Sequence, residues 1–301
     1  MSRSLKAHIL LVLMTLIWGA TFVLNKAALQ SASPLFFNAV RMSLAAILLA
    51  LYYRRHLSQL TRSALRAGMA VGFFLFLGFA FQITGLHLTT PSKSAFLTGV
   101  STVLVPLLLI IVWKAHINHW RAAGIITAFV GLFFMTVPSG RQGIADFANI
   151  NGGDLLTIAC AFAFAFQIIL VGRATQRFPF EQIAVLQMAT AALLTTIATP
   201  ILEHPHLELS STVVWAILIT GILGTAVAFT VQAWAQQFTP ATHAALIFTL
   251  EPVFAWLTSF IVLKERLGMR AGAGALLILA GILMSELLGK VSRPEEALAE
   301  G

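Results

Sequence analysis

The stretch SAFLTGVSTVLVPLLLIIVW, residues 94–113, would form a helix with no charged residue on any face. At 1.5 Å per residue, a helix of this length crosses a hydrocarbon core about 30 Å thick. A helix of a soluble protein keeps charged side chains on the face that meets water. We therefore predict that lipid, and not water, surrounds this segment.

The rest of the chain has the same character. Of its residues, 58% are hydrophobic and 10% are charged, whereas an ordinary soluble domain has roughly 25% charged residues. Apolar stretches of spanning length lie near residues 8–29, 34–53, 67–86, 94–113, 121–138, 154–172, 180–202, 212–234, 242–263 and 270–289. We predict an all-α integral membrane protein with ten transmembrane helices, embedded in a lipid bilayer.

The distribution of lysine and arginine predicts the orientation, because basic loops tend to stay in the cytoplasm. If the N-terminus is inside, the cytoplasmic loops and ends carry Arg3, Lys6, Arg54, Arg55, Arg62, Arg66, Lys114, Arg121, Arg173, Arg177, Lys290 and Arg293. The external loops then carry only Lys93, Arg141, Lys264, Arg266 and Arg270. We expect a multi-pass protein of the plasma (inner) membrane with both termini in the cytoplasm.

The net charge of +8 does not indicate nucleic acid, because the basic residues lie in short loops between apolar stretches and form no continuous groove. The single cysteine, Cys160, excludes an internal disulfide and a cysteine-based zinc cluster. Two histidine pairs, His116 with His119 and His204 with His206, lack the carboxylates that usually accompany a catalytic metal. We expect no metal and no cofactor, and a homodimer is compatible with the sequence.

The two halves of the chain are related by a weak internal repeat. A shift of 149 residues places Gly72 on Gly221 and Thr90-Pro91 on Thr239-Pro240. Because each half has five spans, an odd number, the halves must cross the membrane in opposite senses. Inverted repeats of this kind suit alternating access around a site near the midplane.

Several segments along the chain resemble the EamA-type branch of the drug/metabolite transporter superfamily. They are Trp18-Gly19-Ala20-Thr21-Phe22, Phe37-Asn38-Ala39-Val40-Arg41, Thr239-Pro240-Ala241, Leu250-Glu251-Pro252-Val253-Phe254 and Lys264-Glu265-Arg266-Leu267. The resemblance implies two inverted five-helix halves, a central cavity, and export or exchange of amino acids and related metabolites. The first half departs from the pattern, because Thr102 stands opposite Glu251 and His116 stands opposite Glu265.

The resemblance and the repeat together predict the division of the chain. We expect a first five-helix half over residues 1–140, an external connecting loop over 141–153, a second half over 154–290, and a cytoplasmic tail over 291–301.

Glu251 is an acid deep within an otherwise uncharged span. An ionised group at mid-bilayer costs a few kcal/mol, so its side chain should face a cavity, pair with a base or be protonated. It is a candidate for proton coupling or for binding a substrate amine; alternatively, it is a neutral carboxyl bonded to backbone carbonyls that Pro252 leaves free. His243, two turns earlier, could relay protons or be an ordinary interfacial histidine.

Lys26 and Arg41 lie at similar depth on the first two helices. Two cations facing one vestibule could hold a carboxylate or phosphate, and arginine offers a planar two-pronged donor. Alternatively, Lys26 extends toward the membrane surface and Arg41 holds helices together.

Other polar residues share helix faces, which predicts that they line either the cavity or helix contacts. They are Trp18, Thr21, Asn25, Asn38, Gln82, Gln167, Gln187, Gln232 and Gln236. For any one glutamine the alternative is a hydrogen bond between helices, worth about 1 kcal/mol.

These features favour a secondary transporter of a small-molecule substrate, and not an enzyme. The chain has no GxxxxGK[ST] loop for binding ATP. The alternative is a membrane-embedded enzyme that acts on lipid-linked substrates. Such an enzyme needs acidic pairs, metal ligands or an activated nucleophile at the membrane edge, and the aspartates Asp146 and Asp154 both lie in one external region.

Overall fold

The computed structural model describes residues 2–89, 91–137, 140, 144–145, 148–263 and 268–289. Within these ranges, the side chains of Phe22, Val23, Lys26, His87, Pro91, Ser92, Lys93, Ser259, Phe260, Val262 and Leu263 are not described. The residues outside the described ranges include Thr90, Arg141, Asp146, Lys264, Glu265, Arg266, Leu267, Lys290 and Arg293.

The described chain is a bundle of helices with ten segments long and apolar enough to cross a membrane, which confirms the predicted number. The first half contains α1 (Arg3–Ala28), α2 (Pro34–Tyr52), the short α3 (Arg54–Leu57), α4 (Arg62–Leu88), α5 (Pro91–Gly99), α6 (Ser101–Trp113) and α7 (His119–Thr136). The second contains α9 (Gly152–Arg177), α10 (Phe180–Leu202), α11 (Ser211–Gly221), the π-helix η1 (Ile222–Val227), α12 (Ala228–Ala235), α13 (Ala241–Phe248), α14 (Leu250–Leu263) and α15 (Met269–Leu288).

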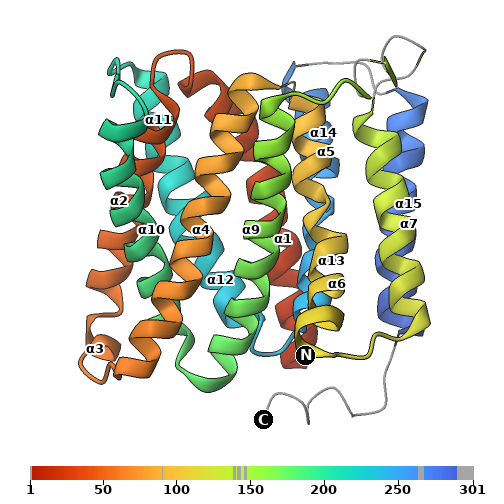
Figure 1. The fold of residues 1–301 in the computed structure, drawn as a ribbon, viewed down its shortest axis with the longest axis horizontal. Coiled ribbons are helices and arrows are strands. Elements are labelled where there is room, and N and C mark those ends of the chain that lie inside the picture. Colours follow the sequence, from red (N-terminus) through yellow and green to blue (C-terminus); the bar gives the residue numbers. More distant parts are fainter. Residues whose placement is uncertain are drawn as a thin grey trace.

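The inverted repeat is visible in the helix bounds. A shift of α1 by the 149 residues of the sequence repeat reproduces the bounds of α9. The fourth span breaks at Val100, between α5 and α6, and the ninth breaks at Thr249, between α13 and α14, which is the same position of the repeat. Helix α1 leaves the face that holds the N-terminus, whereas α9 runs toward that face (Figure 1). The two five-helix repeats are therefore inverted, as predicted.

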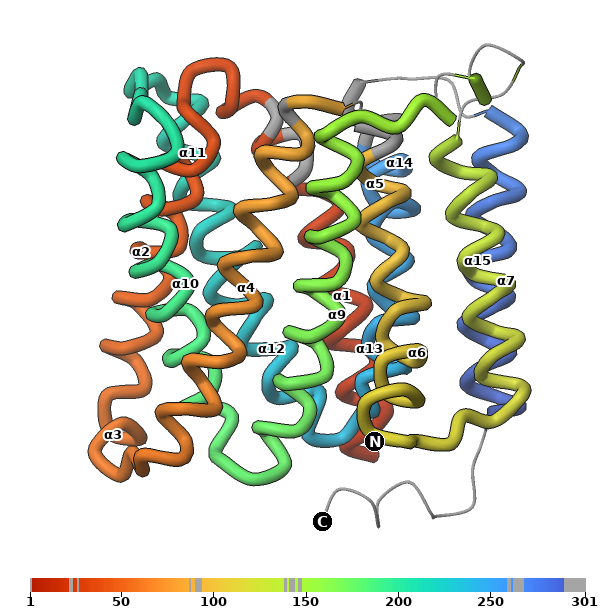
Figure 2. The backbone as a smooth tube through the Cα atoms, viewed as in Figure 1, coloured from red at the N-terminus to blue at the C-terminus, as the bar shows by residue number. Residues whose placement is uncertain are grey.

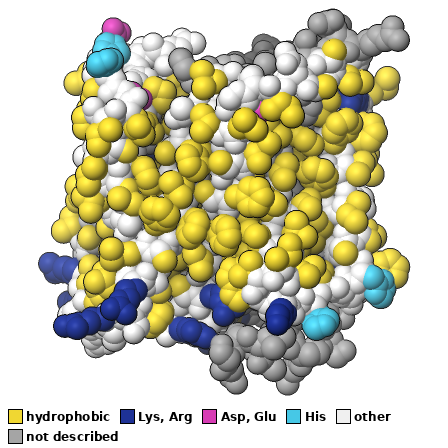
Figure 3. Space-filling model, in the orientation of Figure 1, with side chains coloured by type: hydrophobic (Ala, Val, Ile, Leu, Met, Phe, Trp, Pro, Cys, Tyr) yellow, Lys and Arg dark blue, Asp and Glu magenta, His cyan; other side chains and the backbone are white. Residues whose placement is uncertain are grey.

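The side chains on the outside of the bundle are those expected in lipid. Large apolar residues are exposed along the spanning helices, for example Leu51, Ile111 and Ile201. Figure 3 shows a hydrophobic surface across the middle of the molecule, with most of the visible lysines and arginines along the edge where α1 begins. We call this edge the basic face, and α15 ends on it (Figure 2). The chain is a multi-pass membrane protein.

Glycines allow α7 and α15 to pack at short distance. A Cβ atom on Gly131 would lie 2.5 Å from the Gly274 carbonyl oxygen, and one on Gly281 would lie 2.4 Å from the Gly124 carbonyl oxygen. Without such side chains the two backbones meet directly, which supports helix association where lipid supplies no hydrophobic driving force. Gly268 differs, since a Cβ atom on it would have no described neighbour within 4 Å.

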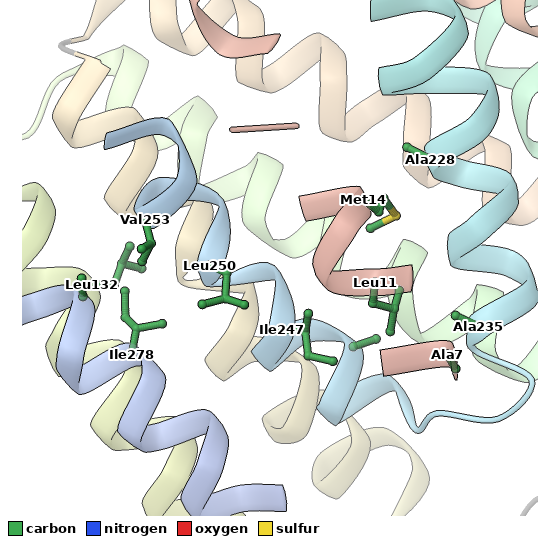
Figure 4. Packing of buried hydrophobic residues seen from close by; sticks show 12 residues of the cluster. Ala7, Leu11, Met14, Leu132, Ala228, Ala235, Ile247, Leu250, Val253 and Ile278 are labelled. Atoms are coloured by element: carbon green, nitrogen blue, oxygen red, sulfur yellow. The ribbon is translucent and has the colours of Figure 1, made fainter. Parts of the chain in front are cut away.

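Other long contacts also join helices of different halves. Helix α4 packs along α9, and α10 packs along both α2 and α4. A buried apolar cluster joins α1 to α12, α13 and α14 and continues to α7 and α15 (Figure 4); it includes Leu11, Met14, Ile247 and Leu250. This cluster therefore joins the first half of the chain to the second.

The opposite face holds a polar contact between the two halves. The backbone N–H of Ser33, before α2, donates to the carbonyl of His206, after α10, at 2.8 Å. The Glu203 carboxylate accepts from the N–H groups of Leu35 at 3.1 Å and of Phe36 at 2.7 Å. These amides belong to the first turn of α2 and have no partner within the helix, so Glu203 of the second half caps a helix of the first.

Candidate functional site

A central cavity of about 420 Å³ lies between the two halves. Its volume falls within the usual range of small-molecule pockets. Its walls come from α1, α2, α4, α5, α6, α7, α9, η1, α12, α13 and α14. They extend from the middle of the bundle, at Trp18 and Gln232, to the ends of helices remote from the basic face, at Leu29 and Thr136. The cavity thus occupies the part of the bundle between its middle and the face remote from the basic face.

Trp18 lies in the wall of the cavity, held by a π-helical turn. Its indole N–H donates to the Gly224 carbonyl at 2.8 Å, and its ring lies 5.4 Å from both Phe229 and Phe248. Gly224 belongs to η1, and a π-turn shifts the backbone hydrogen bonds by one residue, a distortion frequent at functional sites. The first and second halves are therefore joined through Trp18 beside the cavity.

Arg41 is the cation of the described cavity wall. It is buried, with its guanidinium carbon 5.0 Å from the ring centroid of Phe79 and 5.9 Å from that of Phe37. Within the described part of the chain, no ion pair is formed by Arg41 and its Nε has no hydrogen-bond partner. Aromatic faces stabilise a cation, so the charge is held in place while its donors remain available.

Two asparagines of the cavity wall also have side-chain atoms without partners among the described residues. Asn38 is 1% exposed, and neither atom of its side-chain amide is hydrogen-bonded; the side-chain oxygen of Asn25 is likewise unpaired. A buried polar atom without a partner costs about 1–3 kcal/mol. These unsatisfied groups are a reason to expect a polar ligand or water in the cavity.

Glu251 also lines the cavity, from the first turn of α14. The helix break at Thr249 gives the ninth span a half-helix N-terminus at this depth, which favours negative charge. Gly19 makes room for it: a Cβ there would lie 2.8 Å from the Glu251 carbonyl oxygen. In the described part of the chain, neither a base nor a backbone carbonyl bonds to the Glu251 carboxyl.

The remaining sequence candidates fall into two groups. Thr21, Gln82, Gln167 and Gln232 line the cavity, and Gln167 bonds to Gln232 through both amides at 3.2 and 3.3 Å. Three others lie elsewhere. Gln187 lies behind Gln167 and accepts from it at 3.1 Å, Gln236 donates to the Ile168 carbonyl, and His243 lies near the basic face. The Lys26 side chain lies outside the described part of the structure.

Several other serine and threonine residues that line the cavity were not identified from the sequence. Ser94, Thr98, Ser101 and Thr102 line it from α5 and α6. Their spacing of four, seven and eight places them on one helix face, which is the signal that could have revealed them. Thr136 and Thr249 also contribute, and neither has such a pattern around it.

The fold and the cavity are those of a membrane transporter. The chain belongs to the EamA-like transporter family, whose profile matches residues 5–137 and again residues 151–287. The chain is 33% identical over 285 residues to an uncharacterized transporter of Archaeoglobus fulgidus, which covers 95% of this chain and 87% of the relative.

More distant relatives extend this similarity. The uncharacterized transporter YoaV of Bacillus subtilis is 23% identical over 284 residues, 91% of this chain and 94% of its own length. An S-adenosylmethionine/S-adenosylhomocysteine transporter of Chlamydia trachomatis is 24% identical over 206 residues, 65% of this chain and 62% of its own. A crystal structure with 17% identity has the same fold, with a TM-score of 0.76 over 94% of this chain and 98% of that one.

Proposed function

We propose that the chain is a secondary transporter that exports or exchanges small zwitterionic metabolites, amino acids or related compounds, across the plasma membrane by alternating access. The observation that carries the proposal is that Arg41, from the first half, and Glu251, from the second, both line one cavity. A zwitterion has one group for each of these side chains.

The side chains of Arg41 and Glu251 suit different groups of the substrate. The guanidinium of Arg41 suits a carboxylate, which it can hold with two parallel hydrogen bonds, and the Asn38 amide lies on the same helix to supplement it. The Glu251 carboxylate suits an ammonium group or a proton. Because one carboxylate serves both, substrate and proton compete for it, and this competition couples their movement.

The aromatic part of the cavity wall suits the apolar remainder of the substrate. Trp18, Phe79 and Phe248 present aromatic surface to the cavity. S-Adenosylmethionine, the substrate named for the Chlamydia trachomatis relative, carries an α-amino and an α-carboxyl group on a larger body. The similarity between that relative and this chain supports a substrate of the same chemical class, and the experiment below identifies the compound.

The test is transport in proteoliposomes. Uptake of labelled amino acids and of labelled S-adenosylmethionine is measured with and without a proton gradient. The measurement is made for wild type, Arg41→Gln and Glu251→Gln. A charge-assisted hydrogen bond contributes about 1.5–3 kcal/mol, so Arg41→Gln should weaken substrate binding about tenfold to a hundredfold. Glu251→Gln should remove the response to the proton gradient.

Arg173→Gln is the matched control, because Arg173 packs over Trp113 near the basic face and lies outside the cavity. It should transport as wild type does. Unchanged affinity in Arg41→Gln, or unchanged proton coupling in Glu251→Gln, would refute the assigned roles. Product formation without movement of substrate across the vesicle membrane would instead favour a membrane-embedded enzyme.

A further inference from the structure

Three side chains that can bind metal meet outside the central cavity. They are His8 of α1, His243 of α13 and Glu286 of α15. The Nδ1 atom of His243 lies 3.0 Å from Oε1 of Glu286, and the Nδ1 atom of His8 lies 3.6 Å from Oε2 of the same carboxylate. Two imidazoles from different helices thus each direct their Nδ1 atom toward the carboxylate of Glu286.

The cluster lies near the basic face. His8 lies in the second turn of α1, and Glu286 lies in the last turn of α15. The side chain of His243 is 9% exposed, and those of His8 and Glu286 are 21% and 27% exposed. His8 belongs to the first half of the chain, whereas His243 and Glu286 belong to the second.

The distances suit a shared cation. Zn²⁺ binds imidazole nitrogen and carboxylate oxygen at about 2.0–2.2 Å in tetrahedral geometry, which places neighbouring ligand atoms roughly 3.3 Å apart. The two nitrogen–oxygen distances, 3.0 Å to Oε1 and 3.6 Å to Oε2 of Glu286, lie on either side of this value, and a rotation of the carboxylate would offer one oxygen to both imidazoles. The three ligand atoms all lie within 4.8 Å of one another, so small rotations of the rings bring them to bonding distance.

Hydrogen bonding within the described chain satisfies only part of the cluster: His243 is hydrogen-bonded to Glu286, but the second ring nitrogens are left over. The Nε2 atoms of both His8 and His243 are buried and have no partner there. An ordinary buried histidine has its second nitrogen bonded to a carbonyl, a hydroxyl or water. Arg121 of α7 interacts electrostatically with Glu286, and its Nε–H donates to the Gly289 carbonyl at 3.1 Å.

We propose that His8, His243 and Glu286 form a binding site for a divalent transition-metal ion of the Zn²⁺ type, with a fourth position open to water. Two imidazoles and one carboxylate with an open position are a ligand set that such ions accept. If the transport cycle proposed above applies, the metal stabilises the state in which α1 packs against α13 and α15.

The test uses the full chain, purified in detergent and treated with a chelator. Co²⁺, which reports its coordination by its visible absorption, is titrated into wild type, Glu286→Gln and His8→Gln, and Zn²⁺ affinity is measured by calorimetry. Wild type should bind one ion per chain and show the visible absorption of four-coordinate Co²⁺. Loss of an outer partner alone costs about 10- to 100-fold in affinity, so each ligand variant should lose at least about a hundredfold.

His206→Gln is the matched control, because His206 pairs with Glu208 at 3.5 Å on the opposite face, where both are exposed. It should bind metal as wild type does. Gel filtration confirms that each variant is folded, and His243→Gln provides a third variant. Absence of the Co²⁺ spectrum in wild type, or its persistence in Glu286→Gln and His8→Gln, would overturn the proposal. Neither result depends on transport, so this test and that of the transport function can fail separately.

Discussion

At the scale of single residues, Trp18 shows how one side chain joins the two halves. Its indole N–H reaches the Gly224 carbonyl in η1, while its ring packs against Phe229 and Phe248. Trp18→Phe keeps an aromatic ring and removes the donor, so we expect a loss of about 1 kcal/mol. This corresponds to a fall of roughly 2–4 °C in the midpoint of thermal unfolding, measured in detergent.

Trp120→Phe is the control for this prediction, since Trp120 is 41% exposed at the start of α7. Its midpoint should stay within error of wild type. An equal fall in both variants would mean that the hydrogen bond of Trp18 contributes nothing specific.

The sequence reveals some of the site residues and hides others for a physical reason. Arg41 and Glu251 are conspicuous because a charge within an apolar span is costly wherever it lies, and the structure places both in the cavity wall. Gln187 and Gln236 are equally polar but bond to neighbouring helices. The rotation of each helix about its axis decides whether a glutamine faces the cavity or another helix. His8, His243 and Glu286 are far apart in the chain and only tertiary packing brings them together.

At the scale of helices, the glycine contact between α7 and α15 is tightly constrained, because backbone meets backbone there. A methyl group on Gly281 would lie 2.4 Å from the Gly124 carbonyl oxygen. Overpacking costs typically 1–3 kcal/mol, so Gly281→Ala should lower the thermal midpoint by several degrees. Gly272→Ala in the same helix should not, because the nearest atom there is 3.8 Å from the new Cβ. Equal effects of the two substitutions would contradict this account.

The breaks in the spanning helices could be anticipated only in part. Pro106 and Pro252 predict kinks in the fourth and ninth spans, because proline removes a backbone donor. The breaks fall before them, at Val100 and Thr249. The π-helix η1 has no counterpart in α4, the equivalent helix of the first half. Nothing in the residue pattern marks η1, which depends on contacts such as that of Gly224 with Trp18.

At the scale of the whole molecule, the spans and their inverted order follow from hydropathy and the repeat, since lipid imposes the same length and apolarity on each helix. The sidedness is a prediction. Single cysteines at Ser2 and at His204, on opposite faces, can be labelled in intact cells with a membrane-impermeant maleimide. Cys160 is fully buried and gives a low background. His204→Cys should react and Ser2→Cys should react only after lysis; the reverse pattern would place the basic face outside.

The contacts between α4 and α9, between α2 and α10, and between α7 and α15 all pair a helix of one repeat with a helix of the other. A fragment with only the first five spans would therefore expose the surfaces that these partners cover, including the glycine groove of α7. Gene fission between the repeats should yield two polypeptides that are degraded when made separately and persist when made together. A single-repeat ancestor would have met the same requirement by inserting copies in both orientations and joining them as an antiparallel pair.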